Sequence, residues 1–323
     1  MNVNILKSKY LILGGAGFIG TNLIERLLQD RETDITVVDK FTYGNKLLDA
    51  GFSIDTHNFD ITDVKKLGDL IRSKQPTHVI HLAANSNIQI SSGGANSDIT
   101  DTFGTTVALA SCLARNPVEN VFFASTGAIY GVSNKPVSED SPKLPISPYG
   151  WMKLASEEVL MQSLNAGDCK NLLVARFPNV TGKWTTHGVV LDLATKLFLD
   201  KSHLSVLGDG NQTKPYCSAS SLSEAIQTLI DGTNKTWSRQ LVVNLSPNDS
   251  ITVKEIVEIL CQEFDVSPQI SYGESSSGWI GDVPQYSYDT KLSIEHLKGF
   301  VFPESKLAIL DAVRWVKQQR ELN

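Results

Sequence analysis

Three residues have the types and spacing to remove a proton from an alcohol. Tyr149 and Lys153 are four positions apart, and Thr126 precedes them by roughly a strand, a loop and a helix start. A free tyrosine has a pKa of about 10 and is a poor base at neutral pH. A lysine one helical turn away lies on the same helix face, where its positive charge favours the phenolate. The Thr126 hydroxyl can hold a substrate oxygen nearby. Tyr-x-x-x-Lys is also an ordinary helix-surface spacing, so the rest of the chain decides its meaning.

A glycine-rich turn lies near the N-terminus. The apolar run at residues 9–13 predicts a buried strand, and the pattern of residues 22–28 is helical. Between them, Gly14-Gly15-Ala16-Gly17-Phe18-Ile19-Gly20 carries glycines at every third position. Small residues at such a turn let backbone amides approach a pyrophosphate at a helix N-terminus, where the helix dipole favours an anion. The turn therefore predicts a dinucleotide site.

An acidic residue follows at the spacing that such a site requires. Asp39 ends a second predicted strand at residues 35–39, roughly 20 residues beyond the turn. A carboxylate there accepts hydrogen bonds from ribose hydroxyls and repels a 2′-phosphate, which favours NAD over NADP. Lys40 weakens this preference slightly. We predict NAD.

The composition is that of a soluble enzyme. The chain has 323 residues, 41% of them hydrophobic, and a formal net charge of −6. This mild acidity gives no reason to expect nucleic acid or a membrane surface as a partner. No run of about 18 apolar residues predicts a membrane-spanning helix, and the N-terminus lacks the apolar core of a secretory signal. Four scattered cysteines without a C-x-x-C pair favour reduced thiols in a cytoplasmic protein and no metal site.

Strands and helices alternate along the first half of the chain, which predicts parallel pairing with helices on both faces. Further strands are expected at residues 53–59, 76–82, 121–125 and 172–176, and helices at residues 63–73, 99–115 and 149–164. Residues 91–97 form a Ser/Gly-rich loop that is expected to be mobile. We predict an α/β fold with a Rossmann-type doubly wound parallel sheet in residues 1–180. Residues 181–323, which include a helix at 252–264, are expected to form a smaller C-terminal α/β lobe that binds substrate, apart from a strand near 240–245 that returns to the main sheet.

These motifs, in this order and spacing, resemble one family. The chain is similar over nearly its whole length to the extended short-chain dehydrogenase/reductases, in particular the NAD-dependent sugar-nucleotide epimerases and dehydratases, and among these it is UDP-glucose 4-epimerase-like. The resemblance rests on Asp39 and on residues 14–20, 60–61, 81–84, 125–131, 149–153, 176–180 and 207–210.

The resemblance implies a role for each matching position. Tyr149 would be the catalytic base, Lys153 would lower its pKa, and Thr126 would orient the reacting hydroxyl. NAD would lie against Gly14, Gly17, Phe18, Ile19, Gly20, Asp39, Lys40, Asp60, Ile61, Leu82, Ala83, Ala84, Ser125, Tyr149, Lys153 and Phe177. A nucleotide-diphosphate sugar would contact Asn87, Thr126, Asn179, Val189, Lys214 and Trp279.

Plainer roles stay open for three of these residues. Asp60 also suits a helix N-cap. Thr126 also suits a strand-end hydroxyl that satisfies local backbone groups. Asn179 also suits a turn.

The resemblance implies that a hexose hydroxyl at C4 gives its proton to Tyr149 while its carbon gives hydride to NAD. Dehydratases of this family carry an Asp-Glu pair after the catalytic Thr, whereas Gly127 and Ala128 stand here and cannot carry protons. The Glu that decarboxylases usually carry near this position is also absent. Small residues leave room for a 4-keto sugar to rotate, so we predict a nucleotide-sugar 4-epimerase. A 4-dehydrogenase or 4-keto reductase stays open, as does a non-catalytic dinucleotide-binding sensor.

Four positions depart from the family pattern. Asp101 stands where Asn is usual, and a carboxylate there is expected to bind Lys153 or to alter the pKa of the base. Lys214 stands where an Arg often pairs with the diphosphate, and Lys lacks the bidentate fork of Arg. Trp279 stands near the site of a second phosphate-binding Arg and is expected either to stack on a base or sugar or to pack within the protein. Ser221 replaces a usual Asp.

A homodimer is expected by analogy alone. In the family, helices corresponding to residues 99–115 and 149–164 often pair across a two-fold axis. Val107, Leu109, Val159 and Leu160 suit such pairing, and they suit packing against the sheet equally well.

Overall fold

The structure is a computed structural model that describes residues 8–29, 33–85, 96–279 and 281–321. Most of the Ser/Gly-rich segment expected to be mobile, residues 91–95, lies outside these ranges. Asn87, predicted to contact substrate, also lies outside them.

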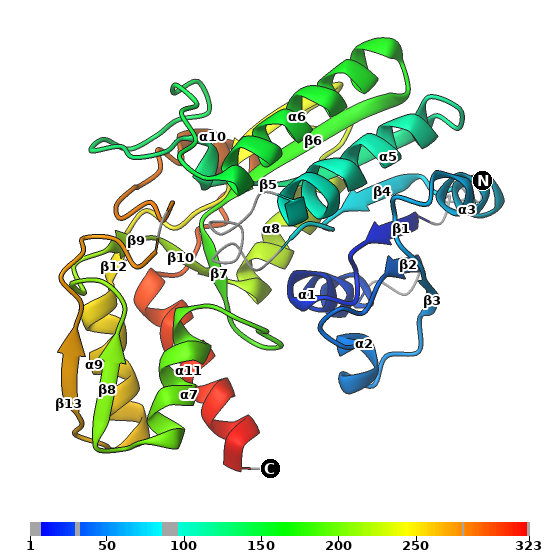
Figure 1. The fold of residues 1–323 in the computed structure, drawn as a ribbon. Helices are drawn as coiled ribbons and strands as arrows, with labels where there is room; N and C mark the ends of the chain where they lie inside the picture. The colour runs from blue at the N-terminus through cyan, green and yellow to red at the C-terminus, as the bar shows by residue number, and fades with distance from the viewer. Residues whose placement is uncertain (1–7, 30–32, 86–95, 280, 322–323) are drawn as a thin grey trace.

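A sheet of seven parallel strands forms the centre of the larger part of the molecule (Figure 1). The strand order is β11-β6-β5-β4-β1-β2-β3. The chain builds outward from β1 to β3 and then starts again at β4 on the other side of β1, so the order reverses between β1 and β4. Ligands of doubly wound sheets bind outside the carboxyl ends of the strands at such a point. The strands are β1 (Lys9–Leu13), β2 (Asp34–Asp39), β3 (Asp55–Asn58), β4 (His78–His81), β5 (Val118–Thr126), β6 (Cys169–Phe177) and β11 (Gln240–Asn244).

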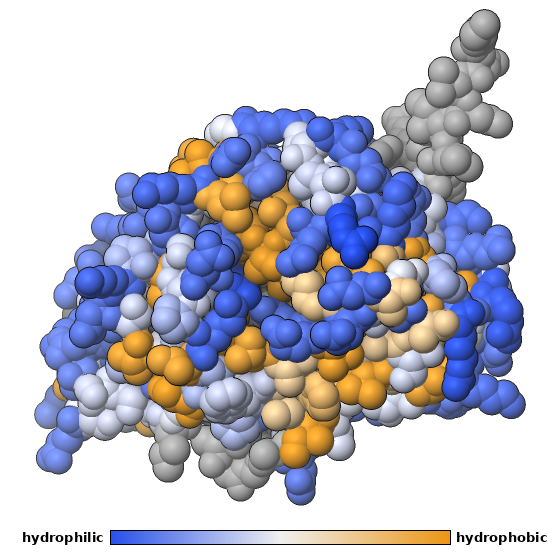
Figure 2. Space-filling view, turned by 90° about the horizontal axis from the view of Figure 1, so that it is seen from above, coloured by the Kyte–Doolittle hydropathy of each residue, from blue (hydrophilic) through white to orange (hydrophobic). Residues whose placement is uncertain are grey.

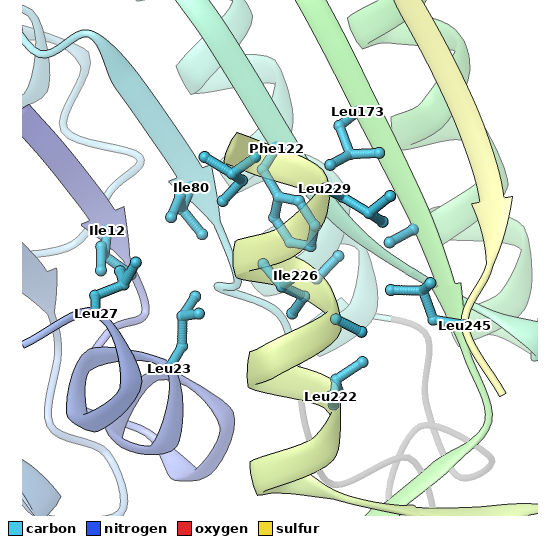
Figure 3. Close-up of a cluster of buried hydrophobic side chains, with 14 of the residues drawn as sticks. Ile12, Leu23, Leu27, Ile80, Phe122, Leu173, Leu222, Ile226, Leu229 and Leu245 are labelled. Carbon is cyan, nitrogen blue, oxygen red and sulfur yellow. The ribbon is translucent and has the colours of Figure 1, made fainter. Parts of the chain in front are cut away.

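Helices cover both faces of this sheet, because its strands are apolar on both sides. In β1, Tyr10 and Ile12 face one layer, and Leu11 and Leu13 face the other. Figure 3 shows the first layer, in which Leu23 of α1 and Ile226 of α8 pack onto the sheet. The helices of the first layer are α1 (Phe18–Leu27), α2 (Lys46–Asp49), α8 (Ala219–Asp231) and α10 (Lys291–His296), and those of the second are α3 (Val64–Lys74), α5 (Thr105–Leu113) and α6 (Pro148–Ala166). The predicted α/β fold with a doubly wound parallel sheet is confirmed.

The helix predicted at residues 99–115 is interrupted. Residues Asp98–Gly104 form a π-helix, η1, and the α-helix α5 begins only at Thr105. The Thr105 hydroxyl donates to the Thr102 carbonyl at 2.9 Å, and the Thr106 hydroxyl donates to the same carbonyl at 3.2 Å. Threonine hydroxyls that bond back in this way compete with backbone N–H groups for the carbonyls, which accounts for the wider turn. π-helical turns often lie at functional sites.

The second lobe has its own core, at the lower left of Figure 1. Apolar side chains of α7, α9 and α11 meet there, including Leu193, Leu260 and Val313. The division of the chain into two domains at residue 180 stays a prediction. The elements of this part are β7 (Asn179–Thr181), α7 (Val189–Leu199), β8 (His203–Val206), β9 (Thr213–Lys214), β10 (Tyr216–Ser218), β12 (Ile251–Thr252), α9 (Val253–Phe264), β13 (Gln269–Tyr272) and α11 (Ser305–Glu321).

The strand expected to return to the main sheet is β11, which pairs in parallel with β6 at its edge. None of the helices in the described ranges has the length and apolar character needed to cross a membrane.

Ile226 tests the packing of α8 on the sheet. It is fully buried, so Ile226→Ala should lower the free energy of unfolding by about 2–5 kcal/mol, since it loses buried surface and leaves a cavity. Denaturant unfolding followed by circular dichroism measures this change. Leu199→Ala is the control, because Leu199 is 84% exposed and its loss should be nearly neutral. Equal effects of the two substitutions would contradict the assigned core.

Candidate active site

A cleft of about 770 Å³ opens at the carboxyl ends of the strands. Its lining includes residues of β2, β5, β6 and α6 and of the turns that follow β1 and β4 on one side, and residues of β7, α7 and β9 on the other. All the described residues predicted to bind cofactor or substrate line this one cleft. Their individual roles stay predictions, and Asn87 lies outside the described residues.

The glycine-rich turn brings the backbone close to its neighbours. Gly14 has a φ of +78°, and a Cβ there would lie 2.7 Å from the backbone N of Ala83 at the end of β4. A Cβ on Gly20 would lie 2.5 Å from the Gly15 carbonyl oxygen. At Gly17 the nearest atom to such a Cβ is 3.5 Å away, so this position borders open space in the cleft. The turn thus has the compact backbone and the free face that a pyrophosphate needs.

Asp39 is held at the end of β2 by two backbone amides. Ala16 N donates to its Oδ2 at 3.0 Å, and Phe41 N donates to its Oδ1 at 2.8 Å. Burial nevertheless raises the pKa of Asp39 above its usual value, against the effect of these bonds. The carboxylate is thereby fixed beside the glycine-rich turn, where it can accept hydrogen bonds from ribose hydroxyls. Glycine turn and carboxylate together fit NAD.

Asp101 does not bind Lys153, contrary to the expectation from sequence. Lys40 Nζ lies 2.8 Å from Asp101 and 3.3 Å from Asp60. Burial lowers the pKa of Lys40, but the bonds to these two carboxylates outweigh it and raise that pKa overall. Asp101 therefore offsets the charge of Lys40, and with Asp39 and Asp60 it makes this rim of the cleft acidic.

The N-cap role left open for Asp60 is wrong. The Thr62 amide and hydroxyl donate to Asp60 Oδ1 at 2.9 and 2.7 Å, which forms a local turn. Asp63 is the N-cap of α3, since its side chain accepts from Lys66 N at 3.1 Å.

Tyr149 and Lys153 lie in the first two turns of α6. Ser147 caps this helix by accepting from Gly150 N at 3.1 Å. Lys153 is 2% exposed; its Nζ donates to the Ala124 carbonyl of β5 at 2.7 Å and lies 5.9 Å from the centre of the Tyr149 ring. The i, i+4 spacing thus places the ammonium beside the phenol, as the sequence predicts.

Thr126 is the last residue of β5, and its hydroxyl acts on both a local backbone amide and the Tyr149 phenol. Its hydroxyl accepts from Ala128 N at 3.2 Å, which is the local bond left open as a plainer role. The same hydroxyl favours the Tyr149 phenolate and so acts to lower the pKa of Tyr149. Thr126 can therefore hold an oxygen beside the phenol without leaving its place in the backbone turn.

The pKa of Tyr149 is raised in the protein without bound nucleotide, and the lowering of this pKa by Lys153 stays a prediction. Burial raises the pKa of the Tyr149 phenol above its usual value, the Asp98 carboxylate raises it further, and the Thr126 hydroxyl opposes both. Burial also lowers the pKa of Lys153 to about 7, although Glu157 acts in the opposite direction. At neutral pH the lysine is therefore only partly charged, and the phenol holds its proton.

No motif of the sequence singles out Asp98. It is fully buried in η1, which packs against α6. Asn85 Nδ2 donates to its Oδ1 at 2.9 Å, while Oδ2 has no hydrogen-bond partner among the described residues. Its position depends on the π-helical turn, which a regular helical pattern does not predict.

A buried ion pair fixes the helix that carries Tyr149. Glu157, one turn after Lys153, lies 2.7 Å from Arg176 of β6, and both side chains are 3% exposed. Ser125 of β5 also donates to Glu157, and Arg176 donates to the Tyr130 hydroxyl at 2.8 Å. These bonds join α6 to β5 and β6, so they restrict movement of the first turns of the helix.

At the end of the cleft away from the glycine-rich turn, where the sequence predicts the substrate, Lys214 of β9 forms an ion pair with Asp282. Asn179 lies in strand β7 and not in a turn, so the turn role left open for it is wrong. Burial raises the pKa of Tyr216, and the Asn179 side chain acts to lower it. Trp279 and Val189, the first residue of α7, also line the cleft.

The four cysteines are free thiols. Cys112, Cys169 and Cys217 are buried, and Cys261 is half-buried. The described parts of the chain contain no group of three or more His, Cys, Asp or Glu residues that could hold a metal ion.

The acidic rim predicts a preference between nicotinamide cofactors. NADP should bind at least about tenfold more weakly than NAD, because its 2′-phosphate would meet Asp39, Asp60 and Asp101. Asp39→Asn should narrow this gap, and fluorescence titration with both cofactors measures it. Asp49→Asn is the control, since Asp49 pairs with Lys46 outside the cleft. Equal affinity of the unaltered protein for NAD and NADP would contradict the prediction.

Comparison with known proteins agrees with this geometry. A sequence model of the NAD dependent epimerase/dehydratase family matches residues 10–244. The putative UDP-glucose 4-epimerase of Methanocaldococcus jannaschii is 28% identical over 274 residues, covering 83% of this chain and 86% of that protein. The dTDP-glucose 4,6-dehydratase of Streptomyces niveus is 27% identical over 69% of each chain. The UDP-glucuronic acid 4-epimerase from Bacillus cereus, solved with UDP-glucuronic acid and NAD, shares the fold with a TM-score of 0.87 and 21% identity, over 96% of this chain and 99% of that one. This chain is thus an NAD-dependent enzyme of the extended short-chain dehydrogenase/reductases and belongs to the NAD dependent epimerase/dehydratase family.

Proposed function

We propose that this protein is an NAD-dependent nucleotide-sugar 4-epimerase that acts through a transient 4-keto hexose. One observation carries the proposal: Thr126, Tyr149 and Lys153 meet at the end of β5, and the two residues after Thr126 carry no proton-transfer group. The names of relatives support a nucleotide sugar as the substrate, since they include UDP-glucose 4-epimerases and dTDP-glucose 4,6-dehydratases.

The three residues divide the proton chemistry among them. Tyr149 Oη takes the proton from the sugar C4 hydroxyl and later returns it. Lys153 stabilises the phenolate, from the position fixed by its bond to Ala124 O. Thr126 holds the reacting oxygen beside the phenol, so its contribution is orientation. Bound NAD supplies the redox chemistry, accepting a hydride from the sugar carbon and returning it.

The packing around Gly127 argues against a 4,6-dehydratase. Family dehydratases carry an acidic residue at this position, but a Cβ on Gly127 would lie 2.0 Å from the Tyr288 hydroxyl oxygen. That hydroxyl donates to the Phe177 carbonyl at 2.9 Å, which holds it in place. Position 127 therefore has no acid/base side chain, and the Tyr288 hydroxyl fills the space that one would need. Without an acid/base group at this position, a 4-keto intermediate would keep its 6-hydroxyl, as an epimerase requires.

Product analysis tests the proposed reaction. Purified protein is incubated with UDP-, GDP-, CDP- and dTDP-hexoses while chromatography follows isomers and absorbance at 340 nm follows NADH. We expect one nucleotide hexose to convert to its 4-epimer without net NADH. Stoichiometric NADH would instead show a 4-dehydrogenase, and loss of the 6-hydroxyl would show a dehydratase. Either result would refute the epimerase.

Tyr149→Phe tests the base. It should lower kcat by about 10²- to 10⁴-fold, the usual contribution of general base catalysis, and change KM little. Tyr43→Phe is the matched control: Tyr43 also lines the cleft and is 45% exposed, but it has no proposed chemical role. Biological activity that survives Tyr149→Phe would favour a non-catalytic dinucleotide sensor.

We also propose a homodimer that pairs through η1, α5 and α6. Leu109 and Leu160 are buried in the core, so they do not belong to this surface. Ile99, Val107 and Trp151 are 46%, 39% and 51% exposed and leave apolar area on it. Figure 2 views the molecule from the top of Figure 1, the side on which α6 lies, and shows apolar residues gathered among hydrophilic ones. Exposed apolar patches of this kind often mark interaction sites.

Sedimentation tests the dimer. The unaltered protein should sediment at about twice the chain mass of 35.3 kDa, and Val107→Glu combined with Trp151→Glu should shift it to the monomer. Leu48→Glu is the control, because Leu48 is 71% exposed on α2, on the other side of the sheet. A monomeric mass for the unaltered protein would reject the proposal.

The free thiols support a reducing compartment. Disulfides form readily in oxidising compartments and are rare in the cytosol. We therefore propose a cytoplasmic location, which cell fractionation would test.

A further inference from the structure

An ion pair lies in the substrate half of the cleft. Lys214 comes from β9, and Asp282 comes from a segment 68 residues later. Both residues line the cleft, and their side chains are 15% and 8% exposed. Lys214 Nζ donates to Asp282 Oδ1, and the backbone N–H of Gly278 donates to Oδ2 at 3.1 Å. The carboxylate therefore binds the cation and anchors its own segment.

Among the described residues that line the cleft, no second cation lies in the same half as Lys214 to share an anionic ligand. The described lining contains three lysines and no arginine: Lys40, Lys153 and Lys214. Lys40 is held by Asp60 and Asp101, and Lys153 is bonded to β5, both at the cofactor end.

The other charged groups of this half do not compete for Lys214. Asp192 lines the cleft but pairs with Lys196 at 2.9 Å, and burial lowers the pKa of His187, which favours the neutral imidazole at pH 7. Asp282 is thus the carboxylate that holds Lys214, in the half that would receive the negative diphosphate of a nucleotide sugar.

We propose that Asp282 is a displaceable counter-ion that holds Lys214 until the anionic group of the substrate replaces it. Carboxylate and phosphate oxygens are equivalent acceptors for an ammonium, so the two compete for the same Nζ. The inference rests on the proposed function, because it assumes a substrate that carries a diphosphate. Part of the binding free energy is then used to break the ion pair. Ligands without the anionic group cannot make this exchange.

Asp282→Asn removes the negative charge that binds Lys214 but keeps an oxygen for the hydrogen bond from Gly278 N. UDP should then bind about 3- to 10-fold more tightly by calorimetry, the range expected for one partly exposed ion pair. The KM of the nucleotide hexose should fall by a similar factor with kcat within about twofold. The affinity for uridine, which has no phosphate, should not change.

Two controls distinguish displacement of Asp282 from Lys214 from the effect of removing any negative charge from this lobe. Asp209→Asn removes one negative charge from the same lobe, outside the cleft lining, and should change UDP affinity less than Asp282→Asn does. Lys214→Met should weaken UDP binding, and Asp282→Asn should give no further gain in that background, as a double-mutant cycle would show. Asp282→Ser provides a second variant if Asp282→Asn folds poorly.

The outcomes are distinguishable from those of the proposed function. Unchanged or weaker UDP binding by Asp282→Asn, an equal gain from Asp209→Asn, or no UDP binding by any variant would overturn the inference. Tighter UDP binding without isomerisation of any nucleotide hexose would support the exchange and refute the epimerase. Isomerisation of a nucleotide hexose without tighter UDP binding by Asp282→Asn would support the epimerase and refute the exchange.

Discussion

The hydrogen bond between Lys153 Nζ and the Ala124 carbonyl fixes one ammonium group at the end of β5, and the proposed chemistry depends on it. The ammonium lies 4.8 Å from the centre of the Phe123 ring and 5.9 Å from that of Tyr149. Its contacts are thus with a strand carbonyl and aromatic faces, with little water. This isolation lowers the pKa of Lys153 to about 7. Because water does not screen it, each charge gained or lost nearby has a larger effect on the phenol.

Opposing effects act on the pKa of Tyr149. Burial and the Asp98 carboxylate favour the protonated phenol, whereas the Thr126 hydroxyl favours the phenolate. The protein alone therefore keeps the base inactive. If the cationic nicotinamide ring of oxidised NAD were bound in the same cleft, the added positive charge would lower the cost of ionising the phenol. Under this account, base strength depends on cofactor binding, and the enzyme does not present a strong base to other ligands.

Local patterns predict the strands, the glycine-rich turn and the Tyr149–Lys153 pairing, because each depends on neighbouring residues and on period. Contacts between distant residues were not predictable in this way. The π-helical turn buries Asp98, whose carboxylate raises the pKa of the Tyr149 phenol, and Lys214 binds a carboxylate 68 residues away. Sequence shows that Gly127 lacks an acid, but only packing shows that Tyr288 fills the space of one. The pKa values of Tyr149 and Lys153 depend on burial, which is a property of the fold and not of local sequence.

The pKa of Tyr149 itself tests the central claim most directly. Tyrosine labelled with ¹³C at Cζ reports ionisation by NMR, and Tyr149→Phe assigns the signal. Without nucleotide, the account predicts a pKa above the ordinary value of 10.0. It predicts a marked fall when NAD binds and a smaller fall in Lys153→Met. A Tyr149 that ionises near pH 7 without NAD, or whose pKa does not respond to NAD, would contradict the account.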